Sequence, residues 1–87
     1  MPQQSALQDP EYIKRMSNKR RRERLENLAE ELFGVSWKDE LAPALRVTPR
    51  TVRRWISGET NIPAVVLVAV GAMLEVDRKV TRQENYG

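Results

Sequence analysis

The chain has 87 residues, of which 15 are Lys or Arg and 12 are Asp or Glu, giving a formal net charge of +3. A chain of this length forms one domain with a modest core. It contains no cysteine and no histidine, which excludes disulfides, thiolate metal sites and the usual general base near neutral pH. We therefore expect no enzymatic activity, no bound metal and no cofactor.

The apolar residues give no sign of secretion or membrane insertion. The N-terminus lacks the apolar run of a signal peptide, and the longest apolar run, residues 62–74, is too short to span a bilayer. We expect a cytoplasmic chain with no membrane partner and no small-molecule substrate.

Positive charge is concentrated in two places. Residues 14–24 hold seven basic residues and one acidic residue, a local charge of +6, and the rest of the chain holds eight basic and eleven acidic residues, or −3. Within that acidic remainder, Arg50, Arg53 and Arg54 form a second basic cluster. Two such patches favour a polyanionic partner, although a solvated charged face would also explain the first patch.

The N-terminal third is predicted to be a tail, a basic helical arm and a helix. Residues 1–8 show no periodicity and are predicted to be disordered. Asp9 and Pro10 open a helical arm over residues 9–24. Either that helix continues through Ser17, or Ser17 or Asn18 caps a new one. The next helix ends before Gly34, and its apolar residues follow a helical repeat: Leu25, Leu28, Ala29, Leu32 and Phe33.

Two short helices are predicted next, over residues 37–45 and 49–57. Ser36 followed by Asp39 indicates a capping box for the first. Pro43 lies inside that helix, so it either starts later or is kinked. Thr48 caps the second helix, whose first residue is a proline, and Gly58 ends it.

The last predicted helix runs from residue 63 to 74 or 75 and is almost uniformly apolar. Its valines leave a buried strand open, but its length and its opening proline favour a helix. A helix that is apolar on every side must be buried on every side, so we expect a second copy to cover part of it. The candidate dimer residues are Val66, Val70, Gly71 and Met73. Residues 77–87 are predicted to form a polar tail.

Residues 37–58 read as a helix-turn-helix, in which the second helix is buried on one face and basic on the other. Ala42 permits a close crossing, Val47 and Val52 join the helices, and Trp37 and Trp55 dock them on the body. The outward side chains of the second helix are Arg50, Thr51, Arg53, Arg54 and Ser57. An arginine there can grip guanine O6 and N7 or a phosphate, and the sequence leaves open which arginine does which.

The chain resembles the lambda-repressor-like, or Cro/XRE-type, helix-turn-helix domains over residues 25–76. The resemblance rests on WKDELAPALRVTPRTVRRW, then ISGE, then NIP before an apolar helix. It implies an all-α, four- to five-helix bundle. It also implies a bacterial or phage-encoded, nucleoid-associated transcription regulator, a repressor, that binds double-stranded operator DNA as a homodimer.

The resemblance also implies roles for individual residues. The candidates for contacting bases are Thr48, Pro49, Arg50, Thr51 and Arg54. The candidates for contacting phosphates are Lys38, Arg53 and Ser57, joined by the arm residues Lys19, Arg20, Arg21, Arg22 and Arg24.

Two departures from the family pattern affect these roles. Arg46 occupies the turn position usually held by glycine, and a left-handed arginine costs about 1 kcal/mol. Pro49 and Arg50 stand where relatives often have Gln, Asn or Ser, which favours half-sites containing G·C pairs.

Two other functions remain open from the sequence. The arginine-rich helix 14–24 could recognise RNA structure. Helix 63–74 could instead dock a protein partner, as in antitoxin-like modules.

Overall fold

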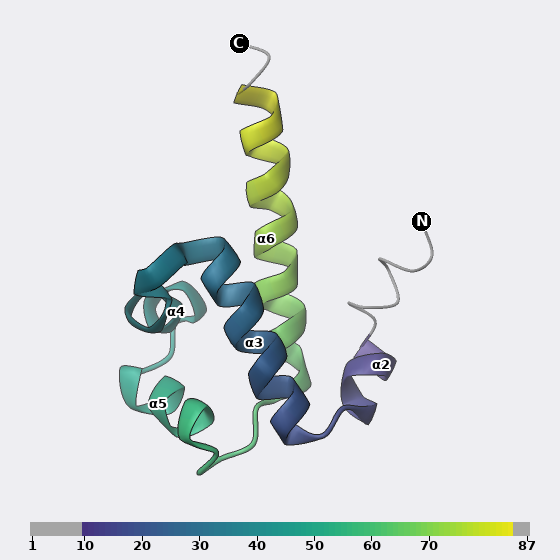
Figure 1. Ribbon diagram of the computed structural model, residues 1–87, viewed down its shortest axis with the longest axis vertical. Helices are drawn as coiled ribbons and strands as arrows, with labels where there is room; N and C mark the ends of the chain where they lie inside the picture. The colour runs from purple at the N-terminus through teal and green to yellow at the C-terminus, as the bar shows by residue number, and fades with distance from the viewer. Residues whose placement is uncertain (1–9, 85–87) are drawn as a thin grey trace.

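The computed structural model describes residues 10–84, and over that range the fold is all-α, as predicted. The predicted disorder of residues 1–8 and the cap at Asp9 lie outside the described residues. The helices are α2 (Pro10–Arg15), α3 (Asn18–Phe33), the 3-10 helix η1 (Gly34–Ser36), α4 (Trp37–Leu45), α5 (Pro49–Ser57) and α6 (Ala64–Glu84) (Figure 1).

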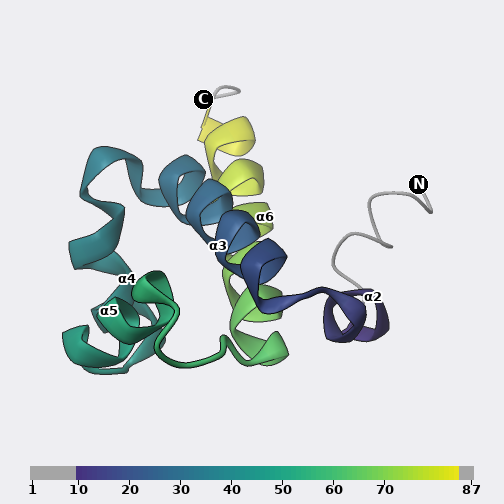
Figure 2. The ribbon, with the colours of Figure 1, turned by 60° about the horizontal axis from the view of Figure 1, so that its bottom comes forward.

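Helices α3 and α6 form the centre of the molecule. α3 packs along α6, α4 packs on α3, α5 packs on α4, and α2 lies against α6 (Figures 1 and 2). The buried side chains form one core: Ile13, Leu25, Leu28, Ala29, Trp37, Leu41, Ala42, Val52, Trp55, Ile62, Val66, Leu67, Val70 and Leu74. This core includes both tryptophans and the alanine expected at the α4–α5 crossing.

The basic arm is broken at Ser17 rather than continuous. The Ser17 backbone is extended, and its hydroxyl accepts a hydrogen bond from the Arg20 N–H at 3.2 Å. Ser17 is therefore the N-cap of α3, which decides between the two possibilities that the sequence left open.

The junction between α3 and α4 differs from the predicted capping box. Gly34 ends α3 with φ 75° and ψ −149°, a conformation nearly restricted to glycine, and donates its N–H to the Glu30 carbonyl. The Ser36 side chain makes no capping hydrogen bond. The capping box is wrong because Ser36 ends η1 with φ −89° and ψ 15° and so lacks the extended backbone that an N-cap side chain needs to reach the first turn of the helix. Helix α4 begins at Trp37 and contains Pro43 on its exposed side. The alternative that this helix starts later is therefore also wrong.

The turn between α4 and α5 contains a left-handed residue although arginine, and not glycine, occupies the position. Arg46 has φ 58° and ψ 42°. Its N–H donates to the Pro43 carbonyl at 3.2 Å, and the Val47 N–H donates to the Ala42 carbonyl at 3.0 Å. These two bonds form a Schellman motif that satisfies the last carbonyls of α4. The strain at Arg46 is therefore offset by a complete helix C-terminus.

Helix α6 is longer than predicted, and one side of it is buried within the single chain while Val65 and Val76 are exposed. It continues to Glu84 instead of ending at residue 74 or 75, and the strand alternative is wrong. Three proposed dimer residues, Val66, Val70 and Gly71, are buried within the single chain, and Met73 is half-buried. The first three cannot form a dimer surface, because α3 and α2 already cover that side of α6.

Replacing Arg46 tests whether the turn stores strain. We expect Arg46→Gly to stabilise the fold by up to about 1 kcal/mol, since glycine adopts positive φ without steric cost. Arg46→Val should destabilise it by more than about 1 kcal/mol, because a branched Cβ is worse there. Urea unfolding of the three proteins measures both changes. Equal stability of the Gly and Val variants would contradict a left-handed residue at this position.

Candidate functional site

The outward face of α5 carries three arginines over a shallow concavity. Val52 and Trp55 point into the core, so at 100° per residue the opposite side of the helix, with positions 50, 53, 54 and 57, faces outward. Arg50, Arg53 and Arg54 are all exposed there. With Ser57 and Glu59 they line a depression of about 310 Å³. The structure thus brings together four residues that the sequence predicted for the site. It adds Glu59, which was not among the predicted site residues.

Arg54 is held by the loop that follows α5. Its Nε lies 3.1 Å from Glu59 Oε2. Ser57 Oγ donates to the Arg54 carbonyl at 3.2 Å and accepts the Glu59 N–H at 3.3 Å. The Thr60 N–H also donates to the Arg54 carbonyl, at 3.3 Å. Ser57, a predicted phosphate contact, therefore already has local partners through its hydroxyl.

Arg50 and Arg53 differ from Arg54 in having free guanidinium groups. Within residues 10–84, neither has a hydrogen-bond or ion-pair partner. Both can therefore donate to an external acceptor without first breaking an internal bond.

The start of α5 is held by two threonines. Thr48 Oγ1 accepts the Thr51 N–H at 3.2 Å and lies 3.0 Å from Thr51 Oγ1. The hydroxyls of these two base candidates thus form the helix cap. Pro49 is exposed and has no donor, so it can offer a partner only apolar contact. Lys38, at the start of α4, lies over the Trp37 ring with its Nζ 5.8 Å from the centroid.

Arg21, a predicted phosphate contact, is instead part of the fold. Its Nη1 donates to the Ile62 carbonyl at 2.7 Å, its Nε to the Ile13 carbonyl at 3.2 Å and its Nη2 to the Lys14 carbonyl at 3.2 Å. The guanidinium therefore joins the end of α2 to the segment before α6. We no longer assign it to phosphate, because each of its three nitrogens already donates to a backbone carbonyl and the side chain is partly buried.

The other arm residues lie on the surface. Lys19 and Arg20 are exposed, and Arg22 and Arg24 are half-buried. The Arg22 guanidinium lies against Gly58, since a Cβ built on Gly58 would meet its Nη1 at 2.4 Å. With the lower side of the molecule turned forward, α2, the start of α3 and α5 all lie on the viewer's side (Figure 2). The backbone of the arm and of α5 thus borders one side of the chain (Figure 2).

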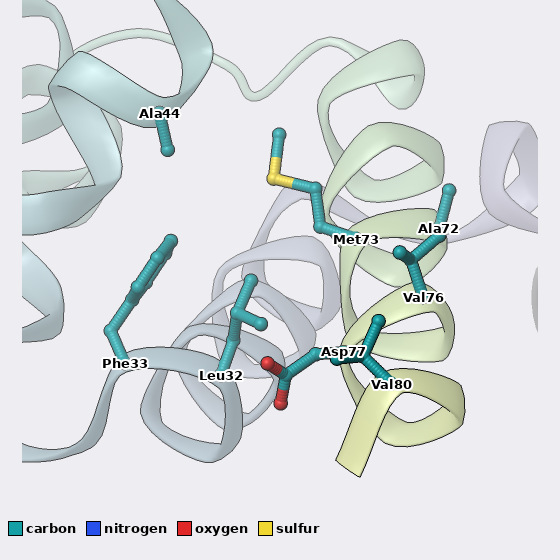
Figure 3. A pocket seen from close by; sticks show the side chains of 8 residues that line it. All are labelled: Leu32, Phe33, Ala44, Ala72, Met73, Val76, Asp77 and Val80. Atoms are coloured by element: carbon teal, nitrogen blue, oxygen red, sulfur yellow. The ribbon is translucent and has the colours of Figure 1, made fainter. Parts of the chain in front are cut away.

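A second, apolar groove lies between α6 and the ends of α3 and α4 (Figure 3). Its volume is about 520 Å³. Phe33, Leu32 and Ala44 face Met73 and Val76 across it (Figure 3). Val76 and Val80 are 61% and 48% exposed, which leaves a pair of valines one helical turn apart uncovered on α6. The sequence had placed Val80 in the polar tail.

Comparison with known proteins identifies no relative. A scan of protein-family models, a search of curated proteins and a search of solved structures each found no match. In the described part of the chain, no helix combines the length and apolarity needed to cross a membrane. Residues 10–84 also contain no cluster of acidic side chains suited to holding a metal ion.

Removing Arg21 tests its structural role. We expect Arg21→Ala to destabilise the chain by about 2–4 kcal/mol, because it leaves three backbone carbonyls without a charged donor. Arg20→Ala is the matched control: it removes the same charge from an exposed neighbour and should change stability by less than about 0.5 kcal/mol. Chemical unfolding measures both. Equal effects of the two substitutions would show that the charge, and not the three bonds, matters at Arg21.

Proposed function

We propose that this chain is a sequence-specific double-stranded DNA-binding regulator of transcription, acting as a repressor. In this proposal α4 and α5 form a helix-turn-helix, and α5 enters the major groove. The observation that carries the proposal is the two-sided character of α5. Val52 and Trp55 fix it to the body while Arg50, Arg53 and Arg54 lie exposed together on its outer face.

The three arginines of α5 suit different parts of a duplex. Arg50 lies near the amino end of the helix, the end that contacts base edges in this docking geometry. Its guanidinium can donate two hydrogen bonds to guanine O6 and N7. Arg54 lies one turn later and can reach the next base, and Arg53 and Lys38 are placed for phosphates. A site of this composition favours G·C pairs.

The basic arm supplies sequence-independent affinity. We still propose that four residues of the arm contact phosphates: Lys19, Arg20, Arg22 and Arg24. Arg21 is no longer among them. Each phosphate neutralised releases counterions, so log K falls with log salt by about 0.9 per contact. This term adds affinity without sequence information.

The two alternative functions have less support. An RNA-reading helix over residues 14–24 would need a continuous basic face, but Ser17 breaks that segment and Arg21 is occupied internally. A protein partner docking through residues 63–74 would need Val66, Val70 and Leu74, all of which are buried inside the chain.

Arg50→Ala tests the proposed base contact. We expect it to weaken binding to a preferred duplex by about 1–3 kcal/mol and to relax the sequence preference at one position, as for loss of a bidentate guanine contact. The measurement is fluorescence anisotropy with a duplex selected from a random pool and with a scrambled duplex. Lys79→Ala, which removes an exposed charge on α6, is the control, and on duplexes that hold a single half-site it should change neither affinity. If Arg50 and Arg54 can both be removed without loss of affinity, α5 is not the recognition helix.

We also propose that the chain binds DNA as a pair of identical copies. α6 continues ten residues beyond Leu74, which is about 15 Å of helix, and Leu74 is the last buried side chain among its residues up to 80. This projecting segment presents Val76 and Val80 beside the apolar groove. One surface therefore offers both a ridge and a groove, as a two-fold contact between copies requires.

The size of this surface indicates a weak pair. Stable interfaces bury about 800 Å² per partner, and three turns of helix with a shallow groove supply less than that. We infer that the two copies associate on DNA, where adjacent half-sites about 10 bp apart hold them together.

Val76→Glu tests this pairing. We expect it to abolish cooperative binding to a duplex with two half-sites and to leave binding to one half-site unchanged, since a carboxylate placed in an apolar contact is costly. Val65→Glu adds the same charge at an exposed valine outside the groove and should preserve cooperativity. Sedimentation velocity with each duplex gives the stoichiometry. A wild-type chain that remains a monomer on the two-site duplex would contradict pairing.

A further inference from the structure

We propose that Glu59 determines the specificity of DNA recognition by positioning Arg54 for a base and by weakening contacts to phosphate. The inference rests on the proposed DNA-binding function and adds a role for an acidic side chain inside the basic surface. Glu59 lines the same concavity as Arg50, Arg53 and Arg54. A carboxylate at this place weakens the attraction of the basic surface for a polyanion. Its contribution to DNA binding must therefore be something other than attraction of phosphate.

The contact between Glu59 and Arg54 restricts the guanidinium. The carboxylate lies 3.1 Å from Arg54 Nε, so it holds the inner nitrogen and leaves both Nη groups without a partner within residues 10–84. A paired Nη fork is suited to two parallel hydrogen bonds with guanine O6 and N7. Restraining the side chain before binding also reduces the rotamer entropy lost in the complex.

The position of Glu59 is set by the backbone. Gly58 turns the chain with φ 84° and donates its N–H to the Trp55 carbonyl. The Glu59 N–H is then held by Ser57 Oγ, and the following N–H, of Thr60, returns to the Arg54 carbonyl. These hydrogen bonds fix the loop that carries Glu59 to the last turn of α5, which carries Arg54. The two side chains therefore pair more readily than two freely moving surface side chains would.

The charge of Glu59 also separates base contact from phosphate contact. A phosphate approaching the three arginines meets a carboxylate among them. At about 8 Å in water-like dielectric, repulsion between two unit charges weakens binding about two- to threefold. A base edge has no net charge and escapes this penalty. Glu59 thus selects for base readout by Arg54.

The test compares Glu59→Gln and Glu59→Asp with the wild-type chain. The probes are a duplex selected from a randomised pool by the wild-type protein and a scrambled duplex of equal composition. Glu59→Gln should raise affinity for the scrambled duplex about two- to threefold and lower the ratio of selected to scrambled affinity at least threefold. Glu59→Asp keeps the charge but shortens the side chain. Glu59→Asp should therefore leave the affinity for the scrambled duplex as low as in the wild type, but it should lower the ratio of selected to scrambled affinity.

Two controls separate positioning from other effects. Glu30→Gln removes an exposed acid from α3 and should leave the affinity ratio unchanged. In an Arg54→Ala background, Glu59→Gln should raise affinity for both duplexes alike, because both carry phosphates, and should no longer change their ratio, because its partner is absent. Thermal unfolding midpoints should stay close to wild type, because the ion pair is exposed.

The outcomes are distinguishable. The role of Glu59 is overturned if Glu59→Gln leaves the ratio of selected to scrambled affinity unchanged, or if it lowers that ratio equally in the Arg54→Ala background. Either result leaves the proposal of DNA binding intact. A wild-type chain with no preference for the selected duplex over the scrambled one overturns the proposed function, and the role of Glu59 falls with it.

Discussion

The structure depends on how the backbone of Ile62 is held. Its N–H donates to Asn18 Oδ1 at 2.9 Å, and its carbonyl accepts from Arg21 Nη1 at 2.7 Å. Both partners come from the first turn of α3, more than 40 residues earlier, and the Ile62 side chain is completely buried. A loop residue with both polar groups bonded and its side chain in the core has little freedom. The segment between α5 and α6 is therefore fixed relative to α3.

This attachment determines how the candidate site is presented. Arg21 also binds the last carbonyls of α2, so the arm and the loop after α5 are joined by one guanidinium. Arg22, the next residue, lies against Gly58 at the end of α5. The basic arm thus supports the face of α5 that we propose reads DNA, and its members Lys19 and Arg20 remain exposed. Rigid placement matters because a base contact requires the side chain to be held close to its productive geometry.

Local sequence signals predicted most of the fold, and long-range contacts explain most of the errors. The repeat in α3, the cap at Thr48 and the ends at Gly34 and Gly58 depend on residues a few positions apart. The role of Arg21 could not be predicted, because its Ile62 partner is 41 residues away and a basic run looks the same whether one member points inward or none does. Three of the four proposed dimer residues, Val66, Val70 and Gly71, are instead buried within the chain, and the sequence could not show this because burial by α3 and burial by a second copy require the same apolar pattern.

The central claim is that the outward face of α5 reads duplex DNA. Amide chemical-shift mapping of the labelled chain, titrated with a selected duplex at about 50 and 200 mM salt, tests it most directly. We expect the largest shifts in residues 48–59 at both concentrations. Shifts at the arm should weaken sharply as salt rises, because phosphate contacts are the salt-sensitive ones. Largest shifts in residues 10–24, with residues 48–59 unchanged, would contradict it.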